Sequence, residues 1–279
     1  MLYQNIKTDA ERAFYGIADA EVTGCTFEGP ADGESALKEV TRVKVSACTF
    51  NLRYPLWHAH GFELSGSTMA DTCRAPLWYS HDGIITDTTC TGVKALRECD
   101  RVSLVGCDFT SAEFGWKCRD ITAKNSRFTS EYFFLDSERV HMENIYLKGK
   151  YSFQYVKDLV IRDSELDTKD SFWHAENVLV ENSTVRGEYL GWYSSGLTMK
   201  NCKIIGTQPF CYCKNLRLEN CELIDCDLAF EYSDVEADLR GHVISVKNPR
   251  SGRIVLDSVG EIIRDGSVFD CTGEVVVRA

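Results

Sequence analysis

The five tryptophans of this 279-residue chain recur at nearly regular intervals, and a tyrosine or histidine often follows them. Trp173 and Trp192, for example, are 19 residues apart, and the residues after them are His174 and Tyr193. Such side chains can stack on the apolar faces of sugar rings while their polar tips form hydrogen bonds. The residues that we predict to bind a ligand are Trp57, His58, Trp78, Tyr79, Trp116, Tyr155, Trp173, His174, Trp192, Tyr193 and Tyr212.

Acid–base chemistry has its own candidates. His174 is a candidate general base, and Asp170 or Asp136 is a carboxylate that could orient it. The alternative is that His174 is a hydrogen-bonded surface residue in an aromatic strip. A second polar group, Glu34, Lys38 and Glu39, lies in the sequence at one end of this strip. These six residues are the catalytic candidates.

An internal repeat places these residues relative to one another. From Val102 onwards the chain aligns without gaps at 19-residue intervals. The register continues backwards to about Ala20, with about two extra residues in the coil that opens at Phe62 and about four in the coil that opens at Ala20. The aligned segments are VSLVGCDF, ITAKNSRF, VHMENIYL, LVIRDSEL, VLVENSTV, LTMKNCKI and LRLENCEL.

Each position of the repeat has a physical meaning. Positions 1 and 3 are apolar and alternate with polar residues, which predicts a short strand with one buried face. Position 5 is nearly always Gly, Asn or Asp, the residues that tolerate a left-handed backbone, and position 6 is small. We expect Asn182, Asn201 and Asn220 at position 5 to stack and to bond to one another.

The pattern predicts an all-β fold, a right-handed single-stranded parallel β-helix of ~19 residues per coil and about 12 coils, because equivalent residues recur in the same order. We expect a single domain over residues 1–279. Residues 1–19 are predicted to be an N-terminal cap, 20–253 the coils and 254–279 a C-terminal cap, since open solenoid ends need covering.

Two adjacent positions of the repeat carry the aromatic residues, and charged members in both favour at least partial exposure. Aromatic stacks also pack the interiors of β-solenoids, so burial remains the alternative. Position 15, the Trp column, reads Lys38, Trp57, Trp78, Arg97, Trp116, Leu135, Gln154, Trp173, Trp192, Cys211 and Phe230. Position 16, the Tyr/His column, reads Glu39, His58, Tyr79, Glu98, Lys117, Asp136, Tyr155, His174, Tyr193, Tyr212 and Glu231.

Composition excludes several classes of function. A net charge of −11 argues against nucleic acid and against anionic polysaccharides, which need a basic surface. No long apolar run predicts a membrane span, and the N-terminal residues lack the plan of a secretory signal, so we expect a cytoplasmic protein. The 13 cysteines are expected to be reduced and buried. No motif indicates a metal or a cofactor.

Several segments resemble an uncharacterised family of bacterial proteins catalogued as domain of unknown function 3737. They are DGESALKE (32–39), YPLWH (54–58), SFWHAEN (171–177), GEYLGW (187–192), LAFEYSDVEA (228–237) and SVKNPRSG (245–252). The resemblance runs from about residue 10 to about residue 265 and implies a pectin-lyase-like right-handed β-helix with no established activity. The positions that match the family's motifs, with no role attached, are Glu34, Lys38, Glu39, Tyr54, Trp57, Trp173 and Trp192.

The wider superfamily contains polysaccharide lyases, glycoside hydrolases and esterases. This sequence lacks the cluster of Asp residues with an Arg base that the lyases would need, and it lacks the paired-Asp-plus-His arrangement of the polygalacturonases. The shared fold therefore does not imply those activities for this chain. Three hypotheses remain: binding of a carbohydrate or similar extended ligand on the aromatic face, a saccharide-active enzyme on that face, and an assembly protein that buries the face in a homo-oligomer.

Overall fold

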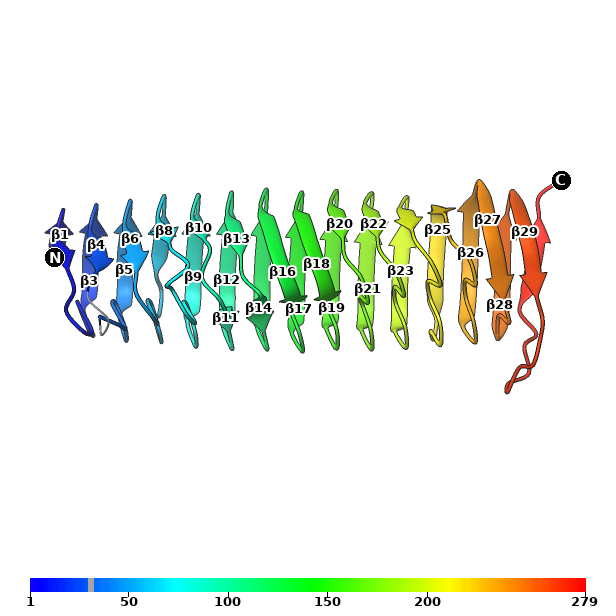
Figure 1. The fold of residues 1–279 in the computed structure, drawn as a ribbon, viewed down its shortest axis with the longest axis horizontal. Coiled ribbons are helices and arrows are strands. Elements are labelled where there is room, and N and C mark those ends of the chain that lie inside the picture. Colours follow the sequence, from blue (N-terminus) through cyan, green and yellow to red (C-terminus); the bar gives the residue numbers. More distant parts are fainter. Residues whose placement is uncertain (30–32) are drawn as a thin grey trace. The chain divides into compact units, whose positions relative to one another are not determined.

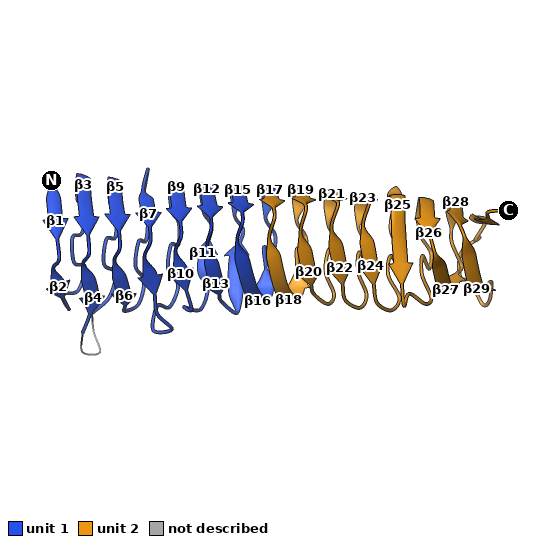
Figure 2. Cartoon of the chain, turned by 90° about the horizontal axis from the view of Figure 1, so that it is seen from above, with its two compact units in different colours: residues 1–141 blue, residues 142–279 orange. Residues whose placement is uncertain are grey.

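The computed structural model describes residues 1–29 and 33–279. Asp32, the first residue of the segment 32–39, therefore lies outside the described residues. The chain divides into two compact units, residues 1–141 and residues 142–279 (Figure 2). The described part contains no helix with the length and apolar character that crossing a membrane requires.

Unit 1 consists of short strands that pair in parallel with strands about one turn away (Figure 1). One ladder joins β1, β3, β5, β7, β9, β12 and β15, and a second joins β2, β4, β6, β8, β10, β13 and β16. The strands are β1 (Leu2–Gln4), β2 (Lys7–Thr8), β3 (Ala18–Thr23), β4 (Thr26–Glu28), β5 (Thr41–Ser46), β6 (Thr49–Asn51), β7 (Glu63–Ser65), β8 (Thr68–Met69), β9 (His81–Thr86), β10 (Thr89–Cys90), β11 (Ala95–Arg97), β12 (Asp100–Val105), β13 (Asp108–Thr110), β14 (Glu113–Trp116), β15 (Arg119–Lys124), β16 (Arg127–Phe133) and β17 (Glu138–Glu143).

Unit 2 repeats this plan. One ladder joins β19, β21, β23, β25, β26, β28 and β30, and a second joins β18, β20, β22, β24 and β25. The strands are β18 (Tyr146–Ser152), β19 (Lys157–Arg162), β20 (Glu165–Asp167), β21 (Glu176–Glu181), β22 (Thr184–Arg186), β23 (Ser195–Lys200), β24 (Lys203–Ile205), β25 (Leu216–Ile224), β26 (Asp234–Arg240), β27 (His242–Lys247), β28 (Ser251–Leu256), β29 (Ser258–Ile263) and β30 (Glu274–Val277).

The predicted fold class is confirmed: the chain is an all-β, right-handed parallel β-helix with roughly 19 residues per turn. The described residues form about 14 turns rather than the expected 12 or so. The reason is that β1 and β2 already pair with β3 and β4, and β30 pairs with β28, so turns extend into both segments that we assigned to caps. The single-domain interpretation stays a prediction.

The longer coils are where the sequence placed them. Val22 pairs with Val45, 23 residues later, and Leu64 pairs with Ile85, 21 residues later. The extra residues lie outside the paired strands, because strand register is fixed by the buried face.

The interior of each unit is a narrow stack of side chains from equivalent positions. In unit 1 the rings of Phe27 and Phe50 are 4.9 Å apart between centroids, and in unit 2 the rings of Phe153 and Phe172 are 5.4 Å apart. All four rings are fully buried. Offset and stacked aromatic pairs of this kind add to the stabilisation from area burial.

The asparagine ladder of unit 2 is confirmed. The Nδ2 of Asn201 donates to Oδ1 of Asn182 at 3.2 Å, and the Nδ2 of Asn220 donates to Oδ1 of Asn201 at 2.8 Å. Asp163 accepts from Asn182 at 3.1 Å. All of these residues have left-handed φ angles between 50° and 52°, as predicted for position 5.

Left-handed backbone also occurs at positions where the repeat pattern did not predict it. Bulky residues directly before the Trp column, such as Leu77 (φ 63°) and Phe172 (φ 60°), adopt it although it costs about 1–2 kcal/mol per residue. Their N–H groups donate to carbonyls of Pro55 and Ser152 at 3.0 and 2.9 Å, and both side chains are fully buried. Burial and backbone pairing between turns therefore offset the local cost.

Candidate functional site

The Tyr/His column of unit 2 forms a continuous ladder of stacked rings. The ring centroids of Tyr155 and His174 are 4.9 Å apart, those of His174 and Tyr193 are 5.0 Å apart, and those of Tyr193 and Tyr212 are 4.7 Å apart. The ring planes in these three pairs differ by only 5°, 5° and 10°. The four rings are therefore nearly parallel and stacked, with one ring on each turn.

The backbone fixes these rings in register. Tyr155, His174 and Tyr193 each lie in a short loop between two strands, and their φ angles are 55° to 58°. The N–H of Tyr155 donates to the Trp173 carbonyl at 2.9 Å, and that of His174 donates to the Trp192 carbonyl at 3.0 Å. The parallel ladder thus continues through the loop that carries the rings.

The ring faces of this ladder are covered by neighbouring rings, while the edges reach solvent. Tyr155 is 50% exposed and Tyr193 is 46% exposed, and His174 is also exposed. Within the described chain no hydrogen bond uses the phenol oxygens of Tyr155, Tyr193 or Tyr212. Burial, with Tyr193 and Glu231 nearby, raises the pKa of the Tyr212 phenol, which keeps its hydroxyl protonated. The column presents a row of unused polar groups.

The tryptophans occupy a different environment. In unit 2 the indole rings of Trp173 and Trp192 are stacked at 5.5 Å and are half-buried. Their Nε1 groups donate to the carbonyls of Tyr189 at 2.6 Å and Gln208 at 3.0 Å. Gln154 occupies the same position one turn earlier and uses its Nε2 in the same way, on the Asp170 carbonyl at 3.1 Å. The Trp column thus fastens one turn to the next.

In unit 1 the Trp column is a mixed stack of indole rings and cations. The rings of Trp57 and Trp78 are 5.5 Å apart and only 4° from parallel. The Arg97 guanidinium lies 4.5 Å from the Trp78 ring centroid and 4.6 Å from that of Trp116, and Lys38 lies 5.6 Å from that of Trp57. The three indole N–H groups again donate to main-chain carbonyls.

The Tyr/His column of unit 1 is short. His58 and Tyr79 are in contact at 5.0 Å with ring planes 42° apart, and the next members are the exposed Glu98 and Lys117. Asp136 is exposed as well. Only the unit 2 part of the column therefore forms a regular ladder within the described residues.

One assignment in these columns is wrong by a single residue. Phe230 stacks on Phe210 at 5.9 Å, and Tyr232, rather than Glu231, follows Tyr212 in the ladder at 5.4 Å and 49°. One extra residue between Ile224, which pairs with Ile205, and Asp227 causes the shift. Sequence reasoning missed Tyr232, although the spacing Phe-x-Tyr recurs in both turns.

The catalytic candidates do not form one constellation. In the described chain no hydrogen bond or ion pair joins His174 to Asp170, and Asp136 belongs to the other unit. Glu34 forms an ion pair with Arg53 at 3.3 Å, while Lys38 lies over Trp57. The side chains of Glu34 and Lys38 therefore contact different residues, and the group with Glu39 does not form one site.

Asp170 stands apart from the other candidates. The residue is only 7% exposed, and its carboxylate forms no ion pair or hydrogen bond in the described chain. Burial raises the pKa of this carboxyl, against the opposing influence of Lys169 and Lys150, and Glu188 adds to the rise. A buried carboxyl with a raised pKa can act as a proton donor.

The thiols are internal packing groups. All cysteines are free, and all except Cys271 are buried. Burial raises the pKa of Cys73 and of Cys213 to about 11, which disfavours the thiolate that metals and electrophiles require. Among the described residues no group of three or more His, Cys, Asp or Glu side chains could hold a metal ion.

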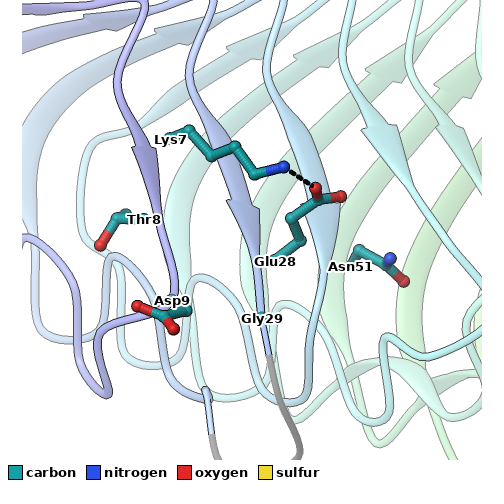
Figure 3. A pocket seen from close by; sticks show the side chains of 6 residues that line it. All are labelled: Lys7, Thr8, Asp9, Glu28, Gly29 and Asn51. Carbon is teal, nitrogen blue, oxygen red and sulfur yellow. Dashed lines mark ion pairs between the residues drawn. The ribbon is translucent and has the colours of Figure 1, made fainter.

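A surface hollow of about 580 Å³ lies away from the aromatic columns (Figure 3). It is polar, and Lys7 and Glu28 from the adjacent strands β2 and β4 form an ion pair of 2.5 Å across it. The ion pair lowers the pKa of Glu28 and raises that of Lys7. None of the residues predicted to bind a ligand lines this hollow.

Comparison with solved structures finds several matches, and the one with a TM-score above 0.5 supports the fold. A mutant tailspike protein of the E. coli bacteriophage HK620, in complex with a pentasaccharide, matches with a TM-score of 0.52 and 8% identity over 99% of this chain and 70% of its own. PfbA, a surface adhesin of Streptococcus pneumoniae, matches with a TM-score of 0.37 and 11% identity over 86% of this chain and 72% of its own. The A-module of the Azotobacter vinelandii mannuronan C-5 epimerase AlgE4 matches with a TM-score of 0.31 and 10% identity over 100% and 89%.

No curated protein matches the chain. One family model does: it covers residues 1–276 and is described as "Protein of unknown function (DUF3737)". The match confirms the resemblance seen in the sequence and extends it almost to both ends of the chain. The protein belongs to this family.

Proposed function

We propose that the Tyr/His column of unit 2 binds a carbohydrate. The observation that carries this proposal is the ladder of the exposed Tyr155, His174 and Tyr193 and the half-buried Tyr212, in which the three phenol oxygens have no hydrogen-bond partner in the described chain. Because the ring faces are covered, the ladder offers a ligand its ring edges with their hydroxyl and imidazole groups, and these suit a ligand rich in hydroxyl groups.

Two further observations support a carbohydrate-related role. The tailspike protein, similar in fold, is described in complex with a pentasaccharide. The net charge of −11 disfavours nucleic acid, since phosphate binding needs a basic surface. We also place the protein in a reducing compartment such as the cytoplasm, because its cysteines are free.

The test is a glycan array followed by titration of the best ligand, with intrinsic fluorescence as the readout. Tyr193→Ala removes the middle of the ladder and is expected to weaken binding by about 10-fold or more, the equivalent of one good aromatic contact with its hydrogen bond. Binding to no glycan, or undiminished binding by this variant, would refute the proposal.

A second candidate function is hydrolysis of the bound saccharide, and Asp170 favours it. A protonated Asp170 would give its proton to the glycosidic oxygen as the bond to the anomeric carbon breaks. Water adds to that carbon and passes a proton to a second carboxylate, for which we propose Glu188, held by Lys169 at 2.7 Å. Release of reducing ends by the native chain, and its loss in Asp170→Asn with binding retained, is the expected result; no release at any pH excludes it.

The third hypothesis, burial of the aromatic face between two copies, concerns the same residues. It predicts a dimer or larger assembly in which Tyr155 and Tyr193 lose their exposure. Solution mass measurement decides between the two: a strict monomer excludes the oligomer and leaves the ladder free for a ligand.

A further inference from the structure

The spacing of the ladder constrains the shape of its ligand. From Tyr155 to Tyr212 the rings follow one another at 4.9, 5.0 and 4.7 Å, and each ring carries a phenol or imidazole polar group. An extended peptide strand advances only about 3.3 Å per residue, so it loses register with such a ladder within two steps. A chain of linked pyranose rings has a repeat of similar size to one turn.

The surroundings of the ladder disfavour a charged polymer. The residues that lie two positions after the rings share no single charge: the exposed Lys157 and Glu176 form an ion pair of 3.5 Å, the half-buried Ser195 is neutral and the exposed Lys214 is positive. No run of one sign follows the ladder, and the whole chain is negative at −11. A polyanion would meet no continuous positive track.

The flat part of the ladder ends within unit 2. Tyr232 is tilted by 49° relative to Tyr212, and the Phe269 ring packs against Tyr232 edge-on at 5.1 Å. The Arg250 guanidinium lies 5.3 Å from the centre of the Phe269 ring. The C-terminal loop therefore covers the fifth ring, and four nearly parallel rings remain open along their edges.

We propose that the ligand is an uncharged, linear, extended glycan that lies along the Tyr/His column with one saccharide per turn and four saccharides in contact. This proposal rests on the function proposed above and adds the shape, charge and length of the ligand. One hydroxyl of each saccharide pairs with one phenol or imidazole group. The row of parallel ring edges fixes the direction in which the glycan lies.

The experiment measures affinity for a series of linear, uncharged 1,4-linked oligosaccharides from the disaccharide to the octasaccharide, by calorimetry on the full chain. The affinity is expected to rise by about 2- to 10-fold per added saccharide up to the tetrasaccharide and then to level off. Tyr212→Ala, which removes the last flat ring, is expected to move this plateau to the trisaccharide. Tyr212→Phe keeps the ring and should lower the affinity for the tetrasaccharide while leaving the plateau where it was.

A matched control is available in unit 1. His60 and His81 are also stacked on the surface, at 5.1 Å, outside both aromatic columns, so His60→Ala should leave the length profile unchanged. If glycans bind but affinity is independent of length, or if branched or anionic glycans bind better, the register proposal is overturned while carbohydrate binding stands. If no glycan of the array or the series binds, the proposed function itself fails.

Discussion

The imidazole ring of His174 lies 5.0 Å from the phenol ring of Tyr193, and the two ring planes are only 5° apart. Tyr155 covers the opposite face of the imidazole at 4.9 Å. The histidine is thus one step of a ladder, and no carboxylate in the described chain is bonded to it. A role in stacking and ligand contact suits this geometry better than that of an oriented general base.

This relationship gives a first prediction. His174→Ala should lower the free energy of unfolding by about 1–3 kcal/mol, because two stacked contacts are lost. His174→Phe restores the rings and should have close to native stability, yet it should weaken glycan binding because it removes the ring nitrogens. Denaturant unfolding and calorimetric titration of both variants test this; equal stability of the two would contradict the stacking role.

The asparagine ladder gives a second prediction. Asn201 donates to Asn182 and accepts from Asn220, and its φ angle is 51°. Asn201→Ala loses both bonds and keeps a Cβ in the left-handed region without the polar side chain that lets Asn tolerate it, so we expect a loss of about 2–4 kcal/mol in unfolding free energy.

Asn201→Gly separates the two contributions. Glycine accepts the left-handed angle without strain and loses only the side-chain bonds, so a loss of about 1–2 kcal/mol is expected from chemical denaturation. If the glycine variant were as unstable as the alanine variant, backbone strain would have no part in the choice of Asn at position 5.

The Trp column gives a third prediction. Trp173→Phe removes the N–H that bonds to the Tyr189 carbonyl and leaves that carbonyl without this donor. We expect a loss of about 1–3 kcal/mol in unfolding free energy. Trp173→Leu removes the aromatic stack on Trp192 in addition and should cost more. If neither substitution changed thermal unfolding, the Trp column would not stabilise the contact between turns, and a role in ligand binding alone would remain.

Arg97 gives a fourth prediction in unit 1. Its guanidinium lies between the Trp78 and Trp116 rings, and its Nη2 donates to Glu113 at 2.6 Å. Arg97→Lys keeps the charge and loses the planar stack, so we expect a loss of about 1–2 kcal/mol in the free energy of unfolding. Native-like stability of the lysine variant in chemical denaturation would show that charge alone suffices at this position.

Asp170 gives a fifth prediction, on pH. Burial raises its folded-state pKa above the unfolded value, so the carboxyl favours folding at low pH, and this contribution is lost as pH rises through the folded pKa. Asp170→Asn is uncharged at every pH and should therefore be more stable than the native chain near neutral pH. The difference should grow as pH rises from the unfolded-state pKa through the raised folded-state pKa, and it should level off above that pKa.

A pH series of denaturant unfolding curves checks this prediction. Glu188→Gln is a suitable second variant, because Glu188 is exposed and contributes to the shift at Asp170 only through its charge. A native chain that is more stable than Asp170→Asn at pH 7 would show that the ionised carboxylate has a partner that favours it.

The register of the turns could be predicted from the sequence, because each position of the repeat has one structural requirement and therefore one type of side chain. Buried apolar residues equivalent to Val102 and Leu104 recur every 19 positions, and residues such as Asn182 and Asn201 mark the left-handed bend. These are local requirements of a strand and a bend, so they are visible in a single chain. The family resemblance came from other segments, such as SFWHAEN (171–177) and GEYLGW (187–192).

Other features depended on contacts between turns that no local pattern contains. The left-handed angles of Leu77 and Phe172 are unfavourable for the residues themselves and exist only because neighbouring turns accept their hydrogen bonds. The one-residue shift before Phe230 is compensated by pairing on either side, which the gapless alignment did not reveal.

The candidate site shows the same division. The sequence by itself determined that Tyr155, His174, Tyr193 and Tyr212 share one position of the repeat, because a fixed period makes residues 19 apart neighbours. Only the tertiary structure decided that these rings stack face to face with exposed edges while the Trp N–H groups bond to main-chain carbonyls. The physical reason is that a period fixes which residues are adjacent, whereas side-chain direction and exposure follow from packing against the next turn.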